Sequence, residues 1–195
     1  LETLAQMYLQ SQDLKSATET FEQLSKAEPD REDILGMLVE LYSNDESQYP
    51  KAIATLDRME QLDGMSERIS YAKAEFYQKM GNGKAAIAEM KKLADQYPND
   101  LNYRSSYADM LLMNNNEKKA IDIYRGILRE EPGNSKVLFS MRTYFKGQGN
   151  MVAADSMTVN ILTASNANTD EKIYLLRQEV MDNENSGSDS TKIIR

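Results

Sequence analysis

The stretch LNYRSSYADMLLMNNNEKKAIDIYRGILREEPGN, residues 101–134, contains the pattern on which the fold depends. Each half places its apolar residues on one face of a helix: Tyr107, Ala108 and Leu111 in the first, and Ala120, Tyr124 and Ile127 in the second. Spacings of i, i+3, i+4 and i+7 are typical of helices that bury a stripe. A polar corner at 114–116 separates the halves and Pro132-Gly133 ends the second, so the stretch predicts a helical hairpin.

The same hairpin recurs along the whole chain. Alanines mark the middle of each second helix at intervals of 35, 34, 34 and 34 residues: Ala17, Ala52, Ala86, Ala120 and Ala154. Large residues of the first helices keep a similar period: Tyr8, Tyr42, Tyr77, Leu111 and Phe145. Residues that suit an N-cap precede four of the second helices: Asp13, Asn82, Asn116 and Asn150. A small residue lets two helix axes approach closely, so the alanines are predicted to lie between packed helices.

This pattern resembles the tetratricopeptide repeat, a unit of about 34 residues of helix, turn and helix. The residues that carry the resemblance belong to the first, third and fourth units: Leu4-Ala5, Tyr8, Ala17, Phe21 and Pro29; Ala74, Tyr77, Gly81, Ala86 and Pro98; and Tyr107-Ala108, Ala120, Tyr124 and Pro132. The resemblance covers five units: 1–31, 32–66, 67–100, 101–134 and 135–168. It implies an all-α fold, a right-handed superhelical solenoid of about five antiparallel helix pairs.

After the five units, the sequence predicts a helix at 169–182 that either solvates the end of the core or begins a sixth unit. Residues 183–195 are a polar tail followed by the start of a truncated helix. The chain begins with Leu1 rather than Met, so we expect any localisation signal to lie upstream of this segment. Both a cytoplasmic and an exported soluble protein fit these observations.

Two units depart from the pattern. The second carries one extra residue between Tyr42 and Ala52, in a polar corner where an insertion leaves the packed faces in register. In the fifth, Arg142 replaces the small residue of the first helix, Thr158 stands where Phe or Tyr is found, and Asn166 replaces proline. Either the array loosens towards its end, or the fifth unit packs against something different.

Composition and motifs give no catalytic, cofactor or metal site. Histidine and cysteine are absent, which removes Ser-His arrangements and thiolate metal sites. Ser70 and Lys73 match the Ser-x-x-Lys pair of penicillin-interacting enzymes, but the partner motifs of that family are missing, so we interpret the match as chance. The stretch 182–187 resembles the opening of an EF-hand loop, but Ile193 stands where its bidentate Glu is required, which favours a solvated linker. No apolar run approaches the ~18 residues of a membrane span.

In tetratricopeptide repeats the first helices build the concave inner face, and this resemblance predicts a ligand-binding groove. Helical spacing assigns thirteen residues to it: Glu2, Gln6, Asp33, Glu40, Arg68, Tyr71, Glu75, Asn102, Ser105, Asp109, Lys136, Phe139 and Thr143. The charged residues of this set are mostly acidic, within a chain of formal net charge −8. The alternative is an ordinary solvated helix face.

The leading hypothesis is a non-enzymatic interaction module that binds a basic or amphipathic peptide or helix in this groove. Relatives that grip a C-terminal carboxylate use Lys, Asn and Arg on three successive first helices, whereas most of the matching places here differ: Glu2 and Gln6, Met37, and Arg68 and Ala72. A carboxylate clamp is therefore not predicted. A structural spacer, an oligomerisation arm such as a homodimer, or a regulatory arm of a larger protein is the alternative. RNA binding would need a basic groove, and this one is acidic.

Overall fold

The computed structural model describes residues 1–165 and 167–185. Over those residues the chain forms eleven α-helices and one short 3-10 helix, without any strand, so the all-α prediction is confirmed. The chain folds as two compact parts, Leu1–Tyr103 and Arg104–Arg195. Within the described residues, no helix is both long enough and apolar enough to cross a membrane.

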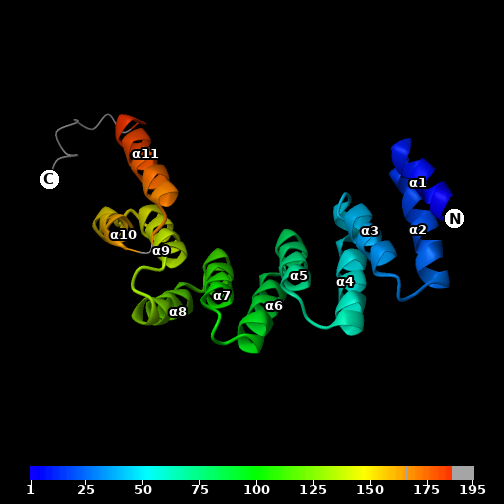
Figure 1. Cartoon of the computed structure of the whole chain (residues 1–195), viewed down its shortest axis with the longest axis horizontal. Helices are drawn as coiled ribbons and strands as arrows, with labels where there is room; N and C mark the ends of the chain where they lie inside the picture. The colour runs from blue at the N-terminus through cyan, green and yellow to red at the C-terminus, as the bar shows by residue number, and fades with distance from the viewer. Residues whose placement is uncertain (166, 186–195) are drawn as a thin grey trace. The chain divides into compact units, whose positions relative to one another are not determined.

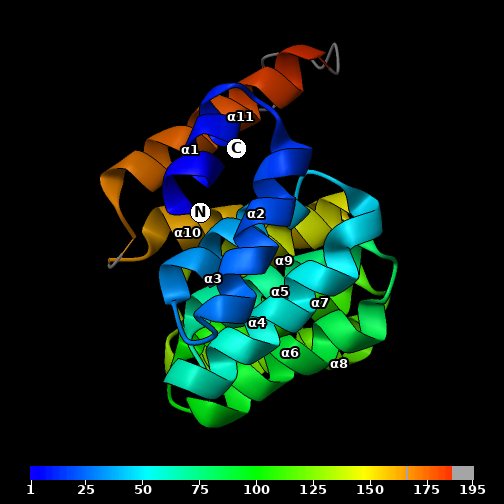
Figure 2. The ribbon, with the colours of Figure 1, turned by 90° about the vertical axis from the view of Figure 1, so that its right-hand side faces the viewer.

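The N-terminal part is built from three successive helix pairs, which Figures 1 and 2 show from two sides. Its helices are α1 (Glu2–Gln10), α2 (Leu14–Ala27), α3 (Glu32–Tyr42), α4 (Tyr49–Asp63), α5 (Glu67–Lys79) and α6 (Gly83–Gln96). The second helices of the first two pairs also pack against the first helix of the next pair, α2 against α3 and α4 against α5. Its core is therefore shared between neighbouring pairs.

The C-terminal part continues the alternation of first and second helices. It contains most of α7 (Leu101–Met113), followed by α8 (Glu117–Glu130), α9 (Ser135–Gly147), α10 (Met151–Thr163) and α11 (Thr169–Asn185). Helix α9 packs against both α8 and α10, and α11 packs on α10 (Figure 1). The predicted helix at 169–182 is thus present as α11, and its Leu175 is completely buried.

The periodic alanines lie where the sequence places them. Each of the five is 0% exposed: Ala17, Ala52, Ala86, Ala120 and Ala154. A second periodic set from the same helices is also buried: Leu24, Met59, Leu93, Ile127 and Ile161. A helix face that contains a fully enclosed alanine can approach its neighbour only while that residue stays small.

Enlarging a buried alanine should therefore destabilise the chain. We expect Ala86→Leu in α6 to lower the free energy of unfolding by about 1–3 kcal/mol, because extra methylene groups in a packed core force neighbours apart. Ala88→Leu is the matched control, since Ala88 is exposed on the same helix and Leu is also a good helix former. Urea denaturation followed by circular dichroism would measure both. Equal stabilities of the two variants would contradict close packing at Ala86.

Three of the four predicted N-caps are confirmed. Asp13, Asn82 and Asn150 accept hydrogen bonds from the backbone N–H of the residue three positions later, at 3.1, 3.2 and 3.1 Å. Asn116 also occupies the N-cap position of α8, but its side chain makes no capping hydrogen bond. Its amide nitrogen instead donates to the backbone oxygen of Asn114 at 2.9 Å, which turns the side chain back into the corner.

The extra residue of the second unit is accommodated at its corner. The segment between α3 and α4 forms the 3-10 helix η1 (Glu46–Gln48), and Asp45 accepts a hydrogen bond from the backbone N–H of Ser47 at 2.9 Å. Tyr42 before the corner and Ala52 after it are both buried. The added length therefore does not displace the packed faces of α3 and α4.

The irregular fifth unit packs against α11, so of the two alternatives the structure favours a different packing partner. Arg142 is buried in α9 and donates to the hydroxyl of Thr158 on α10 at 3.0 Å. Its guanidinium also forms an ion pair with Glu179 on α11, towards which Lys146 points at 3.4 Å. The residues that break the repeat pattern thus form one polar cluster that holds three helices together. Asn166 lies outside the described residues.

Candidate ligand-binding groove

Eight predicted groove residues belong to the N-terminal part, on α1, α3, α5 and the start of α7: Glu2, Gln6, Asp33, Glu40, Arg68, Tyr71, Glu75 and Asn102. All are exposed except Tyr71, which is half-buried. The helices therefore present these side chains to solvent. Exposure alone does not distinguish a binding face from an ordinary solvated face.

Arg31, which the sequence reasoning missed, compensates two of the acidic residues. It precedes α3, and its guanidinium lies 2.7 Å from a carboxylate oxygen of Glu2, 2.6 Å from Asp33 and 3.0 Å from Glu28. Hydrogen bonding to Arg31 lowers the pKa of Asp33 to about 2. Because one cation serves three carboxylates, this end of the predicted acidic face carries less uncompensated charge than the residue list implies.

Glu40 on α3 and Glu75 on α5 differ in their ion pairing. Glu75 pairs with Lys79 one turn along α5, at 2.7 Å, in an exposed arrangement. Exposed pairs of this kind contribute little to stability. Glu40 on α3 has no ion pair among the residues that the structure describes. Glu40 is therefore the more available carboxylate for a positively charged ligand.

In the C-terminal part, α7 and α9 line a shallow, open pocket of about 420 Å³. Its lining brings together three predicted groove residues, Asp109, Phe139 and Thr143, with four that were not predicted: Leu112, Met113, Ser140 and Tyr144. The four lie within one helical turn of the predicted ones, at spacings of one, three or four residues. Extending the prediction by one turn from Asp109 would have found Leu112 and Met113, whereas Ser140 and Tyr144 directly follow predicted residues and are not on the same stripe.

Asp109 is fixed inside this pocket by hydroxyl groups. Its Oδ1 accepts hydrogen bonds from the hydroxyl of Ser140 at 2.8 Å and from that of Tyr124, a completely buried residue of α8. Burial, together with the hydrogen bond to Asp109, raises the pKa of Tyr124 well above its ordinary value, so Tyr124 stays a donor. None of the described residues forms an ion pair with Asp109. The carboxylate is thus oriented without being neutralised.

The surroundings of Phe139 and of the two remaining predicted residues, Lys136 and Ser105, differ. The ring centroid of Phe139 lies 6.5 Å from that of Tyr174 on α11. Lys136 donates from Nζ to the hydroxyl of Ser106 at 2.9 Å. Ser105 is only 1% exposed, and its prediction as a groove surface residue is wrong. Its counterparts Tyr71 and Phe139 are large enough to reach solvent, whereas a serine at that place is covered by its neighbours.

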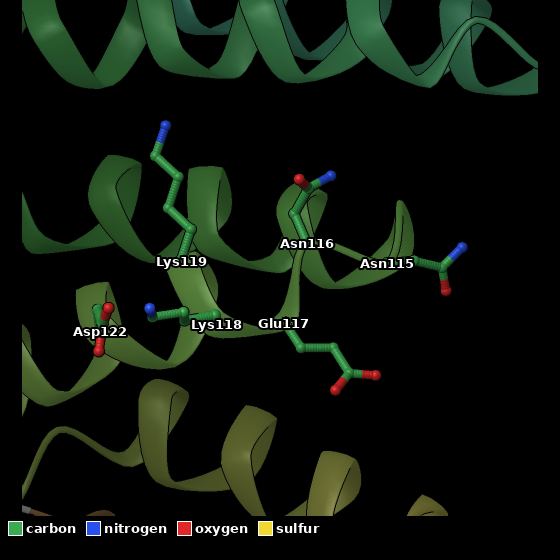
Figure 3. Close-up of a pocket in the computed structure, with 6 residues that line it drawn as sticks. All are labelled: Asn115, Asn116, Glu117, Lys118, Lys119 and Asp122. Atoms are coloured by element: carbon green, nitrogen blue, oxygen red, sulfur yellow. The ribbon is translucent and has the colours of Figure 1, made fainter.

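A second pocket, of about 520 Å³, lies at the corner between α7 and α8. Figure 3 shows that its side chains, among them Lys118, Lys119 and Glu117, point in different directions. Glu117 accepts a hydrogen bond from the hydroxyl of Tyr144 at 2.8 Å and is engaged by α9 in this way. Binding sites place their polar groups so that they converge on a ligand, and this corner does not.

The Ser-x-x-Lys match is part of a buried ion cluster on the N-terminal part. Ser70 is 1% exposed, and Lys73 on α5 is held by Asp57 and Glu60 of α4 and by Glu89 of α6, at 2.7, 2.9 and 3.0 Å. Burial by itself would lower the pKa of Lys73, but the three carboxylates outweigh it and hold the pKa above its ordinary value. Lys73 therefore remains charged and is unsuited to act as a base.

No group of three metal-binding side chains occurs among the described residues. The EF-hand-like stretch extends beyond the last described residue, Asn185, so the structure leaves that prediction untested. The polar tail that follows also lies outside the described residues, which end at 185.

Comparison with known proteins agrees with the helix pattern. Residues 43–110 match the family model described as tetratricopeptide repeat. Over this segment the chain is similar to tetratricopeptide repeats. No curated protein sequence matches the chain.

Solved structures with tetratricopeptide repeats resemble the fold over most of its length. A crystal structure of MamA is 16% identical with a TM-score of 0.58, and the similarity covers 91% of this chain and 97% of that one. YrrB is 12% identical with a TM-score of 0.54 and coverage of 89% and 88%. A tetratricopeptide repeat protein from Parabacteroides merdae is 17% identical with a TM-score of 0.53 and coverage of 90% and 68%. At these identities the likeness establishes the fold.

Proposed function

We propose that this chain is a non-enzymatic protein-interaction module that binds a peptide or a helix on the exposed faces of its first helices. The observation that carries the proposal is the pocket between α7 and α9, where predicted groove residues from two successive first helices meet. A peptide ligand is supported by the similarity to YrrB, a tetratricopeptide repeat protein whose structure is described as having an unusual peptide-binding site.

The pocket suits a ligand that combines a positive charge with an apolar side chain. Asp109 offers a fixed carboxylate without a cationic partner among the described residues, and Leu112, Met113 and Phe139 offer apolar surface beside it. A buried or half-buried charge gains most from a partner of opposite sign. We infer that a Lys or Arg of the ligand meets Asp109 while a neighbouring apolar side chain fills the pocket. The same carboxylate disfavours RNA, whose phosphates it repels.

A carboxylate clamp is not part of the proposal. The places that would grip a ligand's C-terminal carboxylate hold Glu2, Gln6, Met37, Arg68 and Ala72, of which Arg68 is the one cation. Glu2 also forms an ion pair with Arg31, so the Arg31 guanidinium is not available to bind the C-terminal carboxylate of a ligand. The ligand is therefore expected to bind through internal residues.

Selection of peptides from a random phage-displayed library on the full chain would test this function. We expect the selected peptides to be enriched in Lys or Arg next to an apolar residue. We expect Asp109→Asn to weaken their binding about tenfold, as loss of one hydrogen bond to a charged group does. The substitution keeps a side-chain oxygen for Tyr124 and Ser140, so the pocket should remain intact.

Asp122→Asn is the matched control, because Asp122 is an exposed carboxylate of α8 outside this pocket. Isothermal titration calorimetry at two salt concentrations would compare the variants, and the Asp109 effect should shrink at high salt. Peptides without basic residues, or equal affinities for both variants, would rule out the proposed ligand chemistry.

A further inference from the structure

Two tyrosines and two carboxylates gather where α5 begins, α6 ends and α7 begins, in the N-terminal part of the chain. The ring centroids of Tyr97 and Tyr103 lie 5.4 Å apart, with 50° between the ring planes. Tyr97 is 42% exposed and Tyr103 is half-buried, so the pair presents aromatic surface to solvent. We call the set Glu67, Tyr97, Asp100 and Tyr103 the tyrosine corner.

The carboxylates of the tyrosine corner are held beside Tyr103. The hydroxyl of Tyr103 donates a hydrogen bond to Glu67 at 3.2 Å, and the backbone N–H of Tyr103 donates to Oδ1 of Asp100 at 3.3 Å. None of the described residues, the adjacent Arg68 included, forms an ion pair with Glu67 or Asp100. The corner therefore combines exposed aromatic surface with negative charge that the described chain does not neutralise by an ion pair.

The first corner of the chain shows that a guanidinium fits between such helix ends. There Arg31, which directly precedes α3, forms ion pairs with carboxylates at the start of α1, the end of α2 and the start of α3: Glu2, Glu28 and Asp33. The tyrosine corner is built from the corresponding ends of α5, α6 and α7, two helix pairs later. Asp100 directly precedes α7 there, in the place that corresponds to Arg31.

The tyrosine corner adjoins the predicted groove. Tyr71, a groove residue, follows Glu67 by one helical turn on α5, and Asn102, another groove residue, directly precedes Tyr103. Burial and the carboxylate of Glu67 raise the pKa of Tyr103, and Tyr71 adds to this effect, so Tyr71 lies near the Tyr103 hydroxyl. A peptide that lies along the groove residues of α5 can therefore reach the corner with one side chain.

We propose that the tyrosine corner binds an arginine side chain of a peptide, with the guanidinium stacked on an exposed tyrosine ring and hydrogen-bonded to Glu67. The inference rests on the proposed function in taking a peptide as the source of the arginine. It concerns a different set of residues from the pocket between α7 and α9.

A guanidinium suits this corner better than an ammonium group does. It is planar and weakly hydrated, so that its face can stack on a ring while N–H groups at its edge reach a carboxylate. The quadrupole of an aromatic ring also attracts a cation that lies over its face. A lysine ammonium is compact and strongly hydrated, and it gains less from flat aromatic surface. The corner is therefore expected to select arginine over lysine.

Titration with N-acetyl-L-arginine amide, which carries the side chain without charged termini, would test the inference. Nuclear magnetic resonance of the full chain, labelled in its tyrosine rings, would follow Tyr97 and Tyr103. We expect saturable shifts of both rings, with a dissociation constant on the order of 1 mM or weaker for so small a ligand. The lysine derivative should bind at least about threefold more weakly. The citrulline derivative, which keeps the planar shape without the charge, should not bind in this range.

Glu67→Gln is the decisive variant, because it removes the charge and keeps an acceptor for the Tyr103 hydroxyl. We expect it to weaken binding of the arginine derivative about three- to fivefold, the range expected for an exposed charge pair. Glu19→Gln changes an exposed carboxylate of α2 outside the corner and should leave the affinity unaltered. Equal binding of the arginine and lysine derivatives, binding of the citrulline derivative, or an unchanged affinity of Glu67→Gln would overturn the inference.

Asp109→Asn separates this result from the test of the proposed function. The variant should leave the shifts of Tyr97 and Tyr103 with the arginine derivative unaltered, since Asp109 is not part of the tyrosine corner. If selected peptides bind through Asp109 but the arginine derivative shifts neither tyrosine, the inference fails alone. If the derivative binds the corner but no basic peptide is selected, the proposed function fails, and with it the peptide as the source of the arginine.

Discussion

Replacing Lys73 by methionine is expected to lower the free energy of unfolding by about 3–5 kcal/mol, the cost of removing one partner from a buried ion cluster. Lys73 is almost completely buried, and the carboxylates of Glu60 and Glu89 are only 14% and 15% exposed. Methionine keeps the shape of the side chain but leaves these carboxylates without their shared cation. Urea denaturation would measure the loss, and hydrogen exchange in α4 to α6 would locate it.

Lys91→Met provides the matched control for this prediction. Lys91 pairs with Asp95 on α6, and both side chains are about half exposed, so its loss should cost less than about 1 kcal/mol. Adding Glu60→Gln and Glu89→Gln to Lys73→Met should restore much of the stability, because no buried charge is then unpaired. If Lys73→Met and Lys91→Met lowered the free energy of unfolding by similar amounts, the buried cluster would stabilise the fold no more than an exposed ion pair does.

The cluster also predicts a pH dependence. Burial would raise the pKa of Glu60, but hydrogen bonds from Lys92 and Lys73 outweigh it and lower the pKa below its ordinary value of 4.5. A carboxyl group with a lowered pKa in the folded state stabilises the fold above its ordinary pKa and loses that contribution as pH falls. The stability gap between the wild type and Lys73→Met should therefore narrow below pH 4.5.

Arg142→Met is expected to detach α11 from α9 and α10, at a cost of roughly 3 kcal/mol. The substitution keeps most of the apolar stem but removes the guanidinium that binds Glu179 and Thr158. Of the cations in this cluster, Lys146 then remains, with its Nζ 3.4 Å from a carboxylate oxygen of Glu179. Hydrogen exchange should become faster throughout α11, and the urea midpoint of the C-terminal part should fall.

Arg104→Met serves as the comparison in the same part of the chain. Arg104 pairs with Glu130, whose side chain is about half exposed, so the variant should change stability by less than about 1 kcal/mol and leave exchange in α11 unaltered. Unchanged protection of α11 in Arg142→Met would mean that Leu175 and its apolar neighbours hold this helix without the ion pair.

The helix pattern could be predicted because it depends on periodicity. An alanine repeated every 34 or 35 residues returns to the same place in each unit, and all five are fully buried. Helical spacing likewise placed Asp109, Phe139 and Thr143 on faces that meet in one pocket. These predictions need only the geometry of a helix and a regular repeat.

The polar contacts could not be predicted in the same way. Arg31 reaches Glu2 across 29 positions of the sequence, and Lys73 gathers carboxylates from two other helices. Which charges meet depends on the distance between helices and on side-chain rotamers, and neither leaves a periodic signal. The burial of Ser105 was missed for a related reason, since it depends on the size of the residue rather than on its place in the repeat.

The short helix η1 explains how such a chain tolerates insertions during evolution. An added residue between α3 and α4 changes the path of the corner, yet Tyr42 and Ala52 on either side remain buried. A residue added inside a helix would instead rotate every later side chain by about 100°. Natural variation in repeat length should therefore collect at the corners, where it can alter the rim of the protein while the stacking of the helices is inherited unchanged.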